Sequence, residues 1–525
     1  MHLIVVHYHY RPGGVRRVIE LGTPHVLRAI GDGPHRVTLA GGEAPDAEWL
    51  AGFQRAIGRE RLTTFCDAAL GYTEESRLSG SALMTRVEAC LESLIEASRA
   101  ADTVVWAHNL GLGRNIRLTA ALMGRCEALG VRMVAHHHDW WFDHRWGRWA
   151  EMKRLGVRTL AGAAQMVFGA GGWVRHAAIN QADARILRRL GRGQSGWMPN
   201  LVERSPAVSE SELCEAREWL TGRLGDAAPV WLLPCRYLRR KNVGEALLVT
   251  RWLRPEAWMV TTGGPSSVDE QPSYRRWQEN GRRRGWRFRL GILAGVQGRV
   301  PTVAALAKAS EAMLLTSVQE GFGLPYLEAA AAGRPLVCRR LRMVEPDLRR
   351  FGFRFPHAYR EVWIDPSLFD LGAERARQAV LFREWRARLP TALQRGVEPP
   401  ELLTAGGGWK DRPVAMSRLT MTAQLEVLKQ PLERSWELSC GWNSWLLEWR
   451  QRSVQNGLAG MIWSENAEEW LTGKAYEVRF RQLLYGGRRP IGQHEVEESL
   501  KIQQAFLESR MAPEHQYPLL WSPET

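Results

Sequence analysis

Apolar strand-like segments alternate with helical segments twice along this chain, and this alternation constrains its fold more than any other feature. In the first half, the segments that read as strands are residues 2–10, 102–108 and 131–139. After a connection at residues 197–203, the same order begins again with a strand at residues 230–234. A repeated strand–helix order predicts parallel sheets that are covered by helices. The sequence therefore predicts an α/β protein with two parallel-sheet domains that face a cleft.

The chain has 525 residues, which is too long for one hydrophobic core. We expect one domain at residues 1–200, a second at residues 201–365 and a mostly helical, Trp-rich extension at residues 366–525. Residues 399–413 are rich in Gly and Pro, which is typical of a linker or loop. Trp442, Trp445 and Trp449 recur at helical spacing, and such a stripe is more often core than a ligand platform. The role of this extension stays open.

The composition limits which binding partners and which cellular compartment we expect. A net charge of +15 favours acidic partners, which include phosphorylated ligands, anionic lipid and nucleic acid, although the arginines are spread along the whole chain. The seven cysteines are widely spaced and odd in number, which indicates free thiols in a reducing compartment. The N-terminus has no signal-peptide pattern, and no apolar run is long enough to span a bilayer. We expect a cytoplasmic protein, with membrane association left open.

The stretch EGFGLPYLEAAAAGRP, residues 320–335, carries the clearest functional pattern. Pro325 suits the first position of a helix, and Gly333 is typical of its end. The free N–H groups at such a helix start bind anions and hydroxyls. Glu320 lies on the loop before the helix and Glu328 lies inside it, so two acceptors flank one cluster of donors. This arrangement suits a polyhydroxylated, negatively charged ligand such as a nucleotide sugar; a helix start with one solvated glutamate is the plainer interpretation.

Seven short motifs occur in the order found in one enzyme family: Gly13-Gly14, DTVVWAHN, His138-Asp139, MPNLVE, RYLRRKN, TTGGP and SVQEGFGLPYLEAAAAGRPLV. Over residues 1 to about 340, the chain resembles GT-B fold glycosyltransferases, most of all the retaining glycosyltransferase family 4. The resemblance implies two Rossmann-like domains and transfer of a hexose from a nucleotide-diphosphate sugar to an acceptor hydroxyl. The acceptor, whether a glycan, a lipid-linked glycan or a small molecule, stays open.

The resemblance also implies roles for residues of the second domain. Glu320 would contact hydroxyls of the donor sugar, and Glu328 would hold the ribose. Backbone N–H groups of Phe322, Gly323 and Leu324 would face the donor.

Cations of the protein would neutralise the donor diphosphate, so the family needs no metal cofactor. Arg236 and Lys241 take this role, and the Gly13-Gly14 loop closes over the phosphates. We expect Arg239 and Arg240, in the same loop as Lys241, to tolerate substitution by alanine.

In the first domain, His138 would lie near the reacting carbon and the acceptor. His108 and Asp139 would line the same site.

The sequence departs from the family pattern in three places. Cys235 stands where Gly is usual, and three consecutive histidines, residues 136–138, stand where one is expected. Residues 338–345 are rich in arginine in place of a small Gly-bearing loop, which suggests that an acidic group passes nearby.

Two other interpretations concern residues 136–154. His136, His138, Asp139 and His144 are residue types that bind zinc or iron, although they lack a ligand-spacing signature, and a solvated surface position is the alternative for His136 and His137. Tryptophans interleaved with basic residues suit an anionic membrane surface or a sugar-stacking site, while inward packing is the ordinary interpretation; they are Trp140, Trp141, Trp146 and Trp149.

Two alternative functions remain. A phosphorylase or hydrolase on the GT-B fold would use the same glutamates and cations. A non-catalytic basic scaffold would bind nucleic acid or an acidic polymer, but it would not need the donor-site elements, so we expect no nucleic-acid partner.

Overall fold

The structure is a computed structural model of the 525-residue chain. It describes residues 1–33, 35–58, 61–78, 80–143, 146–169, 171–190, 195–202, 208–265, 267–404, 411–486 and 495–521. The chain divides into two compact units. Unit 1 comprises Met1–Glu203, Arg388–Leu393 and Asn466–Met511, and unit 2 comprises Arg204–Ala387, Gln394–Glu465 and Ala512–Thr525.

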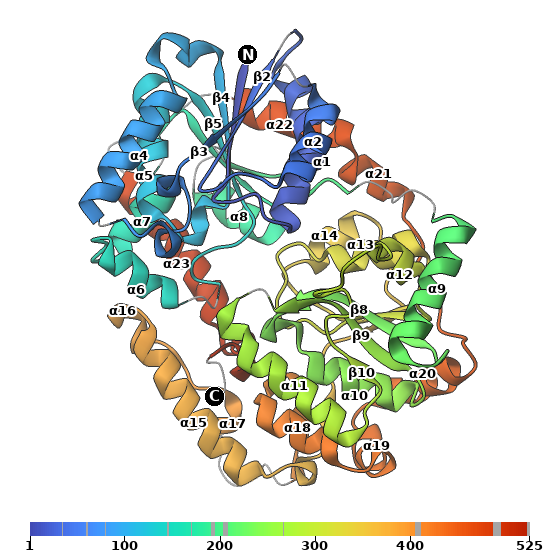
Figure 1. Ribbon diagram of the computed structural model, residues 1–525. Helices are drawn as coiled ribbons and strands as arrows, with labels where there is room; N and C mark the ends of the chain where they lie inside the picture. Colours follow the sequence, from blue (N-terminus) through green and yellow to red (C-terminus); the bar gives the residue numbers. More distant parts are fainter. Residues whose placement is uncertain are drawn as a thin grey trace. The chain divides into compact units, whose positions relative to one another are not determined.

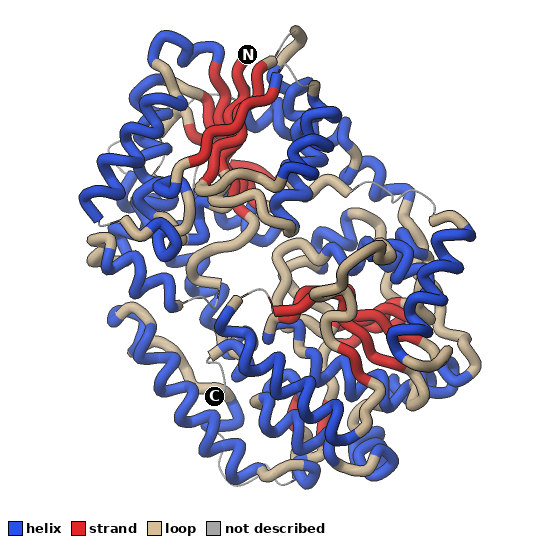
Figure 2. Tube along the Cα trace, viewed as in Figure 1, coloured by secondary structure: helices blue, strands red, loops and turns tan. Residues whose placement is uncertain are grey.

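Unit 1 is built on a seven-stranded parallel sheet (Figures 1 and 2). Its strands are β1 (His2–Val6), β2 (Arg36–Gly41), β3 (Leu62–Cys66), β4 (Thr103–His108), β5 (Arg132–His137), β6 (Val174–Ala178) and β7 (Ser195–Trp197). They lie in the order β3-β2-β1-β4-β5-β6-β7. The first strand, β1, is therefore an interior strand, with β2 on one side and β4 on the other. Strands β2 and β3 are added on one side of β1, and the chain then returns to add β4 to β7 on the other side.

Both faces of this sheet are covered by helices. The main helices are α1 (Gly14–Ile30), α2 (Ala47–Ile57), α4 (Gly80–Leu94), α5 (Ile116–Leu129), α6 (Gly147–Arg154), α7 (Leu160–Phe168) and α8 (Gln181–Leu190). Along β1, Leu3 and Val5 enter one hydrophobic core, whereas Ile4 and Val6 enter another. This alternation follows from the two-residue period of a strand, and it explains why β1 is apolar throughout.

Unit 2 contains a six-stranded parallel sheet. Its strands are β8 (Val230–Tyr237), β9 (Trp258–Pro265), β10 (Phe288–Arg289), β11 (Ala312–Leu315), β12 (Leu336–Arg339) and β13 (His357–Tyr359), in the order β10-β9-β8-β11-β12-β13. The main helices next to it are α9 (Glu210–Leu224), α10 (Val243–Leu253), α11 (Gln271–Arg284), α12 (Val303–Ala309), α13 (Leu324–Ala332) and α14 (Glu345–Arg350). Here β9 and β10 are added on one side of β8, and the chain then returns to add β11, β12 and β13 on the other side.

The region after residue 366 is mostly helical, as the sequence predicted, and both units share it. Its main helices are α15 (Leu371–Arg388), α18 (Met421–Lys429), α19 (Leu432–Cys440), α20 (Ser444–Val454), α21 (Glu465–Leu471), α22 (Gly473–Tyr485) and α23 (Glu495–Met511). Helices α18, α19 and α20 pack on α10 of unit 2. In unit 1, α22 packs on α1 and β5, and α23 packs on α7 and α8.

Two predictions about this architecture can now be assessed. The prediction of two parallel-sheet α/β units with a helical C-terminal region is confirmed. Of the tryptophan stripe, Trp449 is buried and Trp445 packs against the core of unit 2, whereas Trp442 is exposed. Among the described residues, no helix is both long enough and apolar enough to cross a membrane.

Candidate functional site

The strand orders place candidate residues at the position where open α/β sheets bind ligands, namely outside the carboxyl ends of the strands on either side of the reversal. In unit 2 these ends lead into η5 (Arg239–Lys241) after β8 and into the loop before α13 after β11. In unit 1 they lead into the loop before α1 and into His108 at the end of β4.

Glu320 is the centre of a charged cluster in unit 2. Its Oε1 accepts hydrogen bonds from Lys241 Nζ at 2.5 Å and from Ser317 Oγ at 2.6 Å. Its Oε2 accepts one from Arg240 Nη1 at 2.9 Å. The Glu320 and Lys241 side chains are almost completely buried. Two cations therefore hold one carboxylate at the edge of the sheet.

The charge of Glu320 is fixed by these neighbours. Burial alone would raise the pKa of the carboxyl group, but the Lys241 and Arg240 charges, with hydrogen bonds from Lys241 and Ser317, lower its pKa to about 2. Glu320 is consequently an ionised hydrogen-bond acceptor at all physiological pH values.

Helix α13 begins and ends where its sequence indicates. Gly323 caps the start with a left-handed backbone, φ 79°, and a Cβ there would lie 2.7 Å from the Tyr326 ring. Pro325 follows in the first turn, and Gly333 ends the helix, also with a left-handed backbone. Phe322 is buried beside Phe351, and Leu324 is half-buried as the first helical residue. The positive end of the helix thus lies directly after Glu320.

Glu328 differs from Glu320 in its surroundings. Its side chain is half-buried and forms no hydrogen bond or ion pair with the described part of the chain. Burial, with the Glu320 charge, raises the pKa of Glu328 to about 7, and Lys241 offsets part of this effect. Glu328 therefore changes its ionisation near neutral pH.

Several residues that sequence reasoning missed hold the two loops together. Thr316 Oγ1 donates to the Lys241 carbonyl oxygen at 2.9 Å, and the Val318 N–H donates to that of Arg240 at 2.9 Å. Asn242, which has a left-handed backbone with φ 50°, accepts a hydrogen bond from Gln424 Nε2 at 2.9 Å. Gln424 belongs to α18, so the C-terminal region supports the loop that carries Lys241. No local sequence signal marks this long-range contact.

The other cations at the end of β8 and in the loop after it, Arg236, Arg239 and Arg240, differ in their surroundings. Arg236 is exposed, and among the described residues it has no hydrogen-bond or ion-pair partner. Arg239 forms an ion pair with Glu270 at 3.3 Å. Arg240 binds Glu320 at 2.9 Å, and whether Arg239 and Arg240 tolerate alanine stays a prediction.

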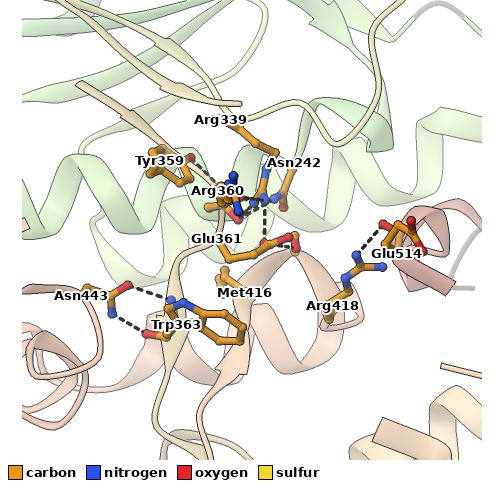
Figure 3. A network of polar contacts seen from close by, with 12 residues as sticks. Asn242, Arg339, Tyr359, Arg360, Glu361, Trp363, Met416, Arg418, Asn443 and Glu514 are labelled. Atoms are coloured by element: carbon orange, nitrogen blue, oxygen red, sulfur yellow. Dashed lines mark hydrogen bonds and ion pairs between the residues drawn. The ribbon is translucent and has the colours of Figure 1, made fainter. Parts of the chain in front are cut away.

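The acidic group expected near residues 338–345 is supplied by this chain itself (Figure 3). Arg339 is buried, and its guanidinium binds Glu361 at 2.5 Å and Glu245 at 2.5–2.6 Å. Arg342 binds Glu514 at 3.2 Å. Cys235, which stands where Gly is usual, is buried in the hydrophobic core of unit 2.

In unit 1, Gly13 caps the start of α1 with an extended backbone, and Gly14 is its first residue. Both are exposed, and a Cβ at Gly14 would have no atom within 4 Å. The fold of unit 1 therefore leaves open space beside Gly14.

His138 and Asp139 lie in the loop after β5, and their backbone N–H groups donate to Asn109 Oδ1 at 3.0 and 2.9 Å. His138 Nε2 lies 3.1 Å from Nδ1 of His108, which is buried at the end of β4. The structure thus brings His108 and His138 together, and their predicted place beside the acceptor stays a prediction. Burial and the neighbouring histidines lower the pKa values of both imidazoles well below the usual range.

The interpretation of His136 and His137 as surface histidines was wrong, because both are buried. His136 Nε2 donates to the Met198 carbonyl oxygen at 3.1 Å, and burial lowers its pKa to about 4. His137 pairs with His176 at 2.9 Å. His144 lies outside the described residues.

The tryptophans of residues 140–149 are all buried: Trp140, Trp141, Trp146 and Trp149. Inward packing is therefore confirmed. The four rings are not presented to a membrane or to a sugar.

A comparison with models of known protein families finds no match for this chain. The chain is 22% identical over 356 residues to the mannosylglucosyl-3-phosphoglycerate synthase of Petrotoga mobilis. This match covers 65% of the chain and 66% of that protein, so the chain spans just under two thirds of its relative.

Solved structures give weaker similarities. Anabaena HepE in complex with UDP-glucose is 17% identical, with 65% of this chain and 80% of that chain covered and a TM-score of 0.43. A UDP-forming α,α-trehalose-phosphate synthase from Burkholderia vietnamiensis is 15% identical, with 86% and 99% covered and a TM-score of 0.43.

Proposed function

We propose that this chain is a retaining glycosyltransferase that resembles family 4 and moves a hexose from a nucleotide-diphosphate sugar to an acceptor hydroxyl. The observation that carries the proposal is the buried Glu320 carboxylate, held by Lys241 and Arg240 at the start of α13. Its position after β11, at the reversal of the strand order, is where open α/β sheets bind ligands.

The donor sugar and nucleotide would bind through acceptors and donors of unit 2. Glu320 would accept hydrogen bonds from sugar hydroxyls, and Glu328 would accept those of the ribose. The N–H groups of Phe322, Gly323 and Leu324 would donate to the donor, because the first N–H groups of a helix lack partners within it.

The diphosphate would be neutralised by Arg236 and Lys241. In the cluster, Arg240 and Lys241 are two cations against the one fully ionised carboxylate of Glu320, and the exposed Arg236 lies near the end of the same strand, β8. A cation about 4 Å from a unit negative charge contributes up to about 4 kcal/mol at an effective dielectric near 20. The leaving diphosphate gains charge as the glycosidic bond breaks, so this contribution would be larger in the transition state than in the ground state. Turnover would therefore need no added Mg²⁺ or Mn²⁺.

Unit 1 would supply the acceptor side. We assign the phosphate-facing loop to Gly13 and Gly14, and a Cβ at Gly14 would have no atom within 4 Å. His138, His108 and Asp139 would face the acceptor and the reacting carbon. The named product of the Petrotoga relative, a glycosylated 3-phosphoglycerate, supports transfer to an acceptor molecule.

A thermal-shift screen against UDP-, GDP- and ADP-sugars tests the donor assignment first. One of these donors should raise the melting temperature, and Glu328→Ala should reduce that rise while the protein stays folded. The stabilising donor is then incubated with acceptors, and with inorganic phosphate alone. Acceptor-dependent nucleoside diphosphate release supports a transferase, whereas phosphate-dependent or water-dependent sugar release would support a phosphorylase or hydrolase instead. A protein that no nucleotide sugar stabilises, but that binds nucleic acid with a steep salt dependence, would overturn the proposal.

A further inference from the structure

Three imidazoles of unit 1 converge at the carboxyl ends of two neighbouring strands. His108 ends β4 and pairs in register with His136 of β5, and His138 follows β5. One ring nitrogen from each residue lies within 4.8 Å of those of the other two. His108 and His136 are fully buried, and His138 is partly exposed.

The hydrogen bonds of His136 leave a ligand atom free. Its Nε2–H donates to the Met198 carbonyl oxygen at 3.1 Å, so the neutral ring carries its lone pair on Nδ1. This Nδ1 is buried and has no hydrogen-bond partner. Metal-bound histidines almost always donate their second ring N–H to a carbonyl or carboxylate oxygen, which fixes the ring. His136 therefore has the hydrogen-bond arrangement of a metal ligand.

The distance between ring nitrogens of His108 and His138 is also close to that expected for two ligands of one metal ion. His108 Nδ1 and His138 Nε2 are 3.1 Å apart. Two nitrogens that bind one zinc ion tetrahedrally at about 2.0–2.1 Å lie about 3.3 Å apart. The ring centroids of His136 and His138 are 4.6 Å apart, and a ring nitrogen of His136 lies within 4.8 Å of those of His108 and His138.

We propose that His108, His136 and His138 bind one divalent transition-metal ion, with zinc as the expected ion. Imidazole suits Zn²⁺, Co²⁺ and Ni²⁺, and zinc held by three histidines keeps a fourth position for water or substrate. His138 is the partly exposed member of the set, so we expect solvent or substrate to reach that position from its side. The sequence pointed to His136 and His138 but not to His108, because only the strand pairing brings His108 beside them.

This inference does not rest on the proposed transferase function, because the ion is measured without a sugar donor. It also leaves the cations of unit 2 as the diphosphate partners. With the ion bound, His108 and His138 would serve as its ligands, and the open position of the ion would be the part available to an acceptor.

The test uses untagged full-length protein that is purified without metal-affinity resin. Elemental analysis after zinc loading and gel filtration should find about one zinc per chain. Loading with Co²⁺ should give the intense visible absorption of a four-coordinate centre, which distinguishes this site from six-coordinate ions on surface histidines.

His136→Gln and His108→Gln should each lower zinc affinity at least about tenfold, since even outer-shell changes cost 10–100-fold. His176→Gln is the matched control, because it is a buried histidine of the neighbouring strand β6 that pairs with His137. It should keep the zinc and the Co²⁺ spectrum. Wild-type protein that holds no zinc after loading, or equal zinc affinity in His136→Gln and wild type, would overturn the proposal.

Discussion

At the scale of single residues, the Lys241–Glu320 ion pair should affect both the stability of unit 2 and the proposed activity. Both groups are buried, so each needs the other to offset the loss of hydration. Glu320 has further partners in Arg240 and Ser317, whereas Lys241 is held mainly by Glu320. A substitution at either position should therefore change stability as well as activity, and the two effects must be measured separately.

Lys241→Ala should lower kcat/KM about a hundredfold, or about 2.7 kcal/mol, because the departing diphosphate loses its cation. The melting temperature should fall as well, since Glu320 keeps only Arg240 and Ser317. Steady-state kinetics below the melting temperature of the variant isolate the first effect. Arg289→Ala, an exposed cation on β10 of the same sheet, is the control and should retain full activity. Equal small losses in both variants would mean that the loop is only a basic surface.

Arg236→Lys should also be impaired, because lysine lacks the planar fork of arginine.

Glu328 should make donor affinity depend on pH. Burial raises its pKa to about 7, so the fraction of carboxylate grows as pH rises through 7. Because the carboxylate accepts ribose hydroxyls better than the acid does, the donor should bind more tightly at pH 8 than at pH 6. A fall of one pKa unit on binding gives a change of about fivefold. Calorimetric titration with the intact nucleotide sugar measures this change, and Glu328→Gln should remove it. A pH dependence that persists in Glu328→Gln would assign the titration to another group.

At the scale of elements, α13 shows how far local sequence determines structure. Its start at Gly323-Leu324-Pro325 and its end at Gly333 follow from the backbone preferences of Gly and Pro, and the sequence predicted both. The burial of Glu320 was not predictable in the same way. It depends on Lys241 and Arg240, which are 79 and 80 positions away along the chain and reach Glu320 only because β8 pairs with β11.

Gly323→Ala should destabilise unit 2 by about 1–2 kcal/mol, because a Cβ is unfavourable in the left-handed region. The added methyl would also meet the Tyr326 ring, so the start of α13 should shift and donor affinity should fall. Gly14→Ala is the matched comparison, since its Cβ would point into open space. The free energy of unfolding of Gly14→Ala, measured by chemical denaturation, should equal that of wild type. A Gly323→Ala protein as stable as wild type would show that the helix start tolerates a side chain.

At the scale of the whole molecule, the C-terminal region is part of both units. In unit 2, Leu425, Leu428 and Leu446 belong to the main hydrophobic core. In unit 1, the buried Arg510 binds Asp143 at 2.8 Å and Asp183 at 2.6 Å. The sequence indicated helices here but not their partners, because burial of these residues depends on contacts with segments hundreds of positions away. The same limit applies to Arg339, whose acidic partners are Glu245 of α10 and Glu361 of the loop after β13.

A chain truncated after Pro413 should not fold into a soluble protein. The truncation removes α18–α20 from the core of unit 2 and Arg510 from two buried aspartates of unit 1. Leaving buried charges without a partner typically costs about 3–5 kcal/mol, which is a large share of the stability of a domain. Size-exclusion chromatography and circular dichroism measure the outcome. A monomeric truncated protein with the wild-type melting temperature would contradict this role of the C-terminal region.

The most direct test of the proposed transferase compares sugar transfer by wild type and Glu320→Gln, using the donor found in the thermal-shift screen. The substitution keeps the size of the side chain but removes the charge that Lys241 and Arg240 hold in place. Wild type should transfer the sugar with its anomeric configuration retained, as nuclear magnetic resonance of the product would show. Glu320→Gln should still unfold cooperatively but transfer at least about a hundredfold more slowly, the rate ratio that corresponds to about 2.7 kcal/mol. Near-normal transfer by Glu320→Gln would contradict the assignment of this cluster as the donor site.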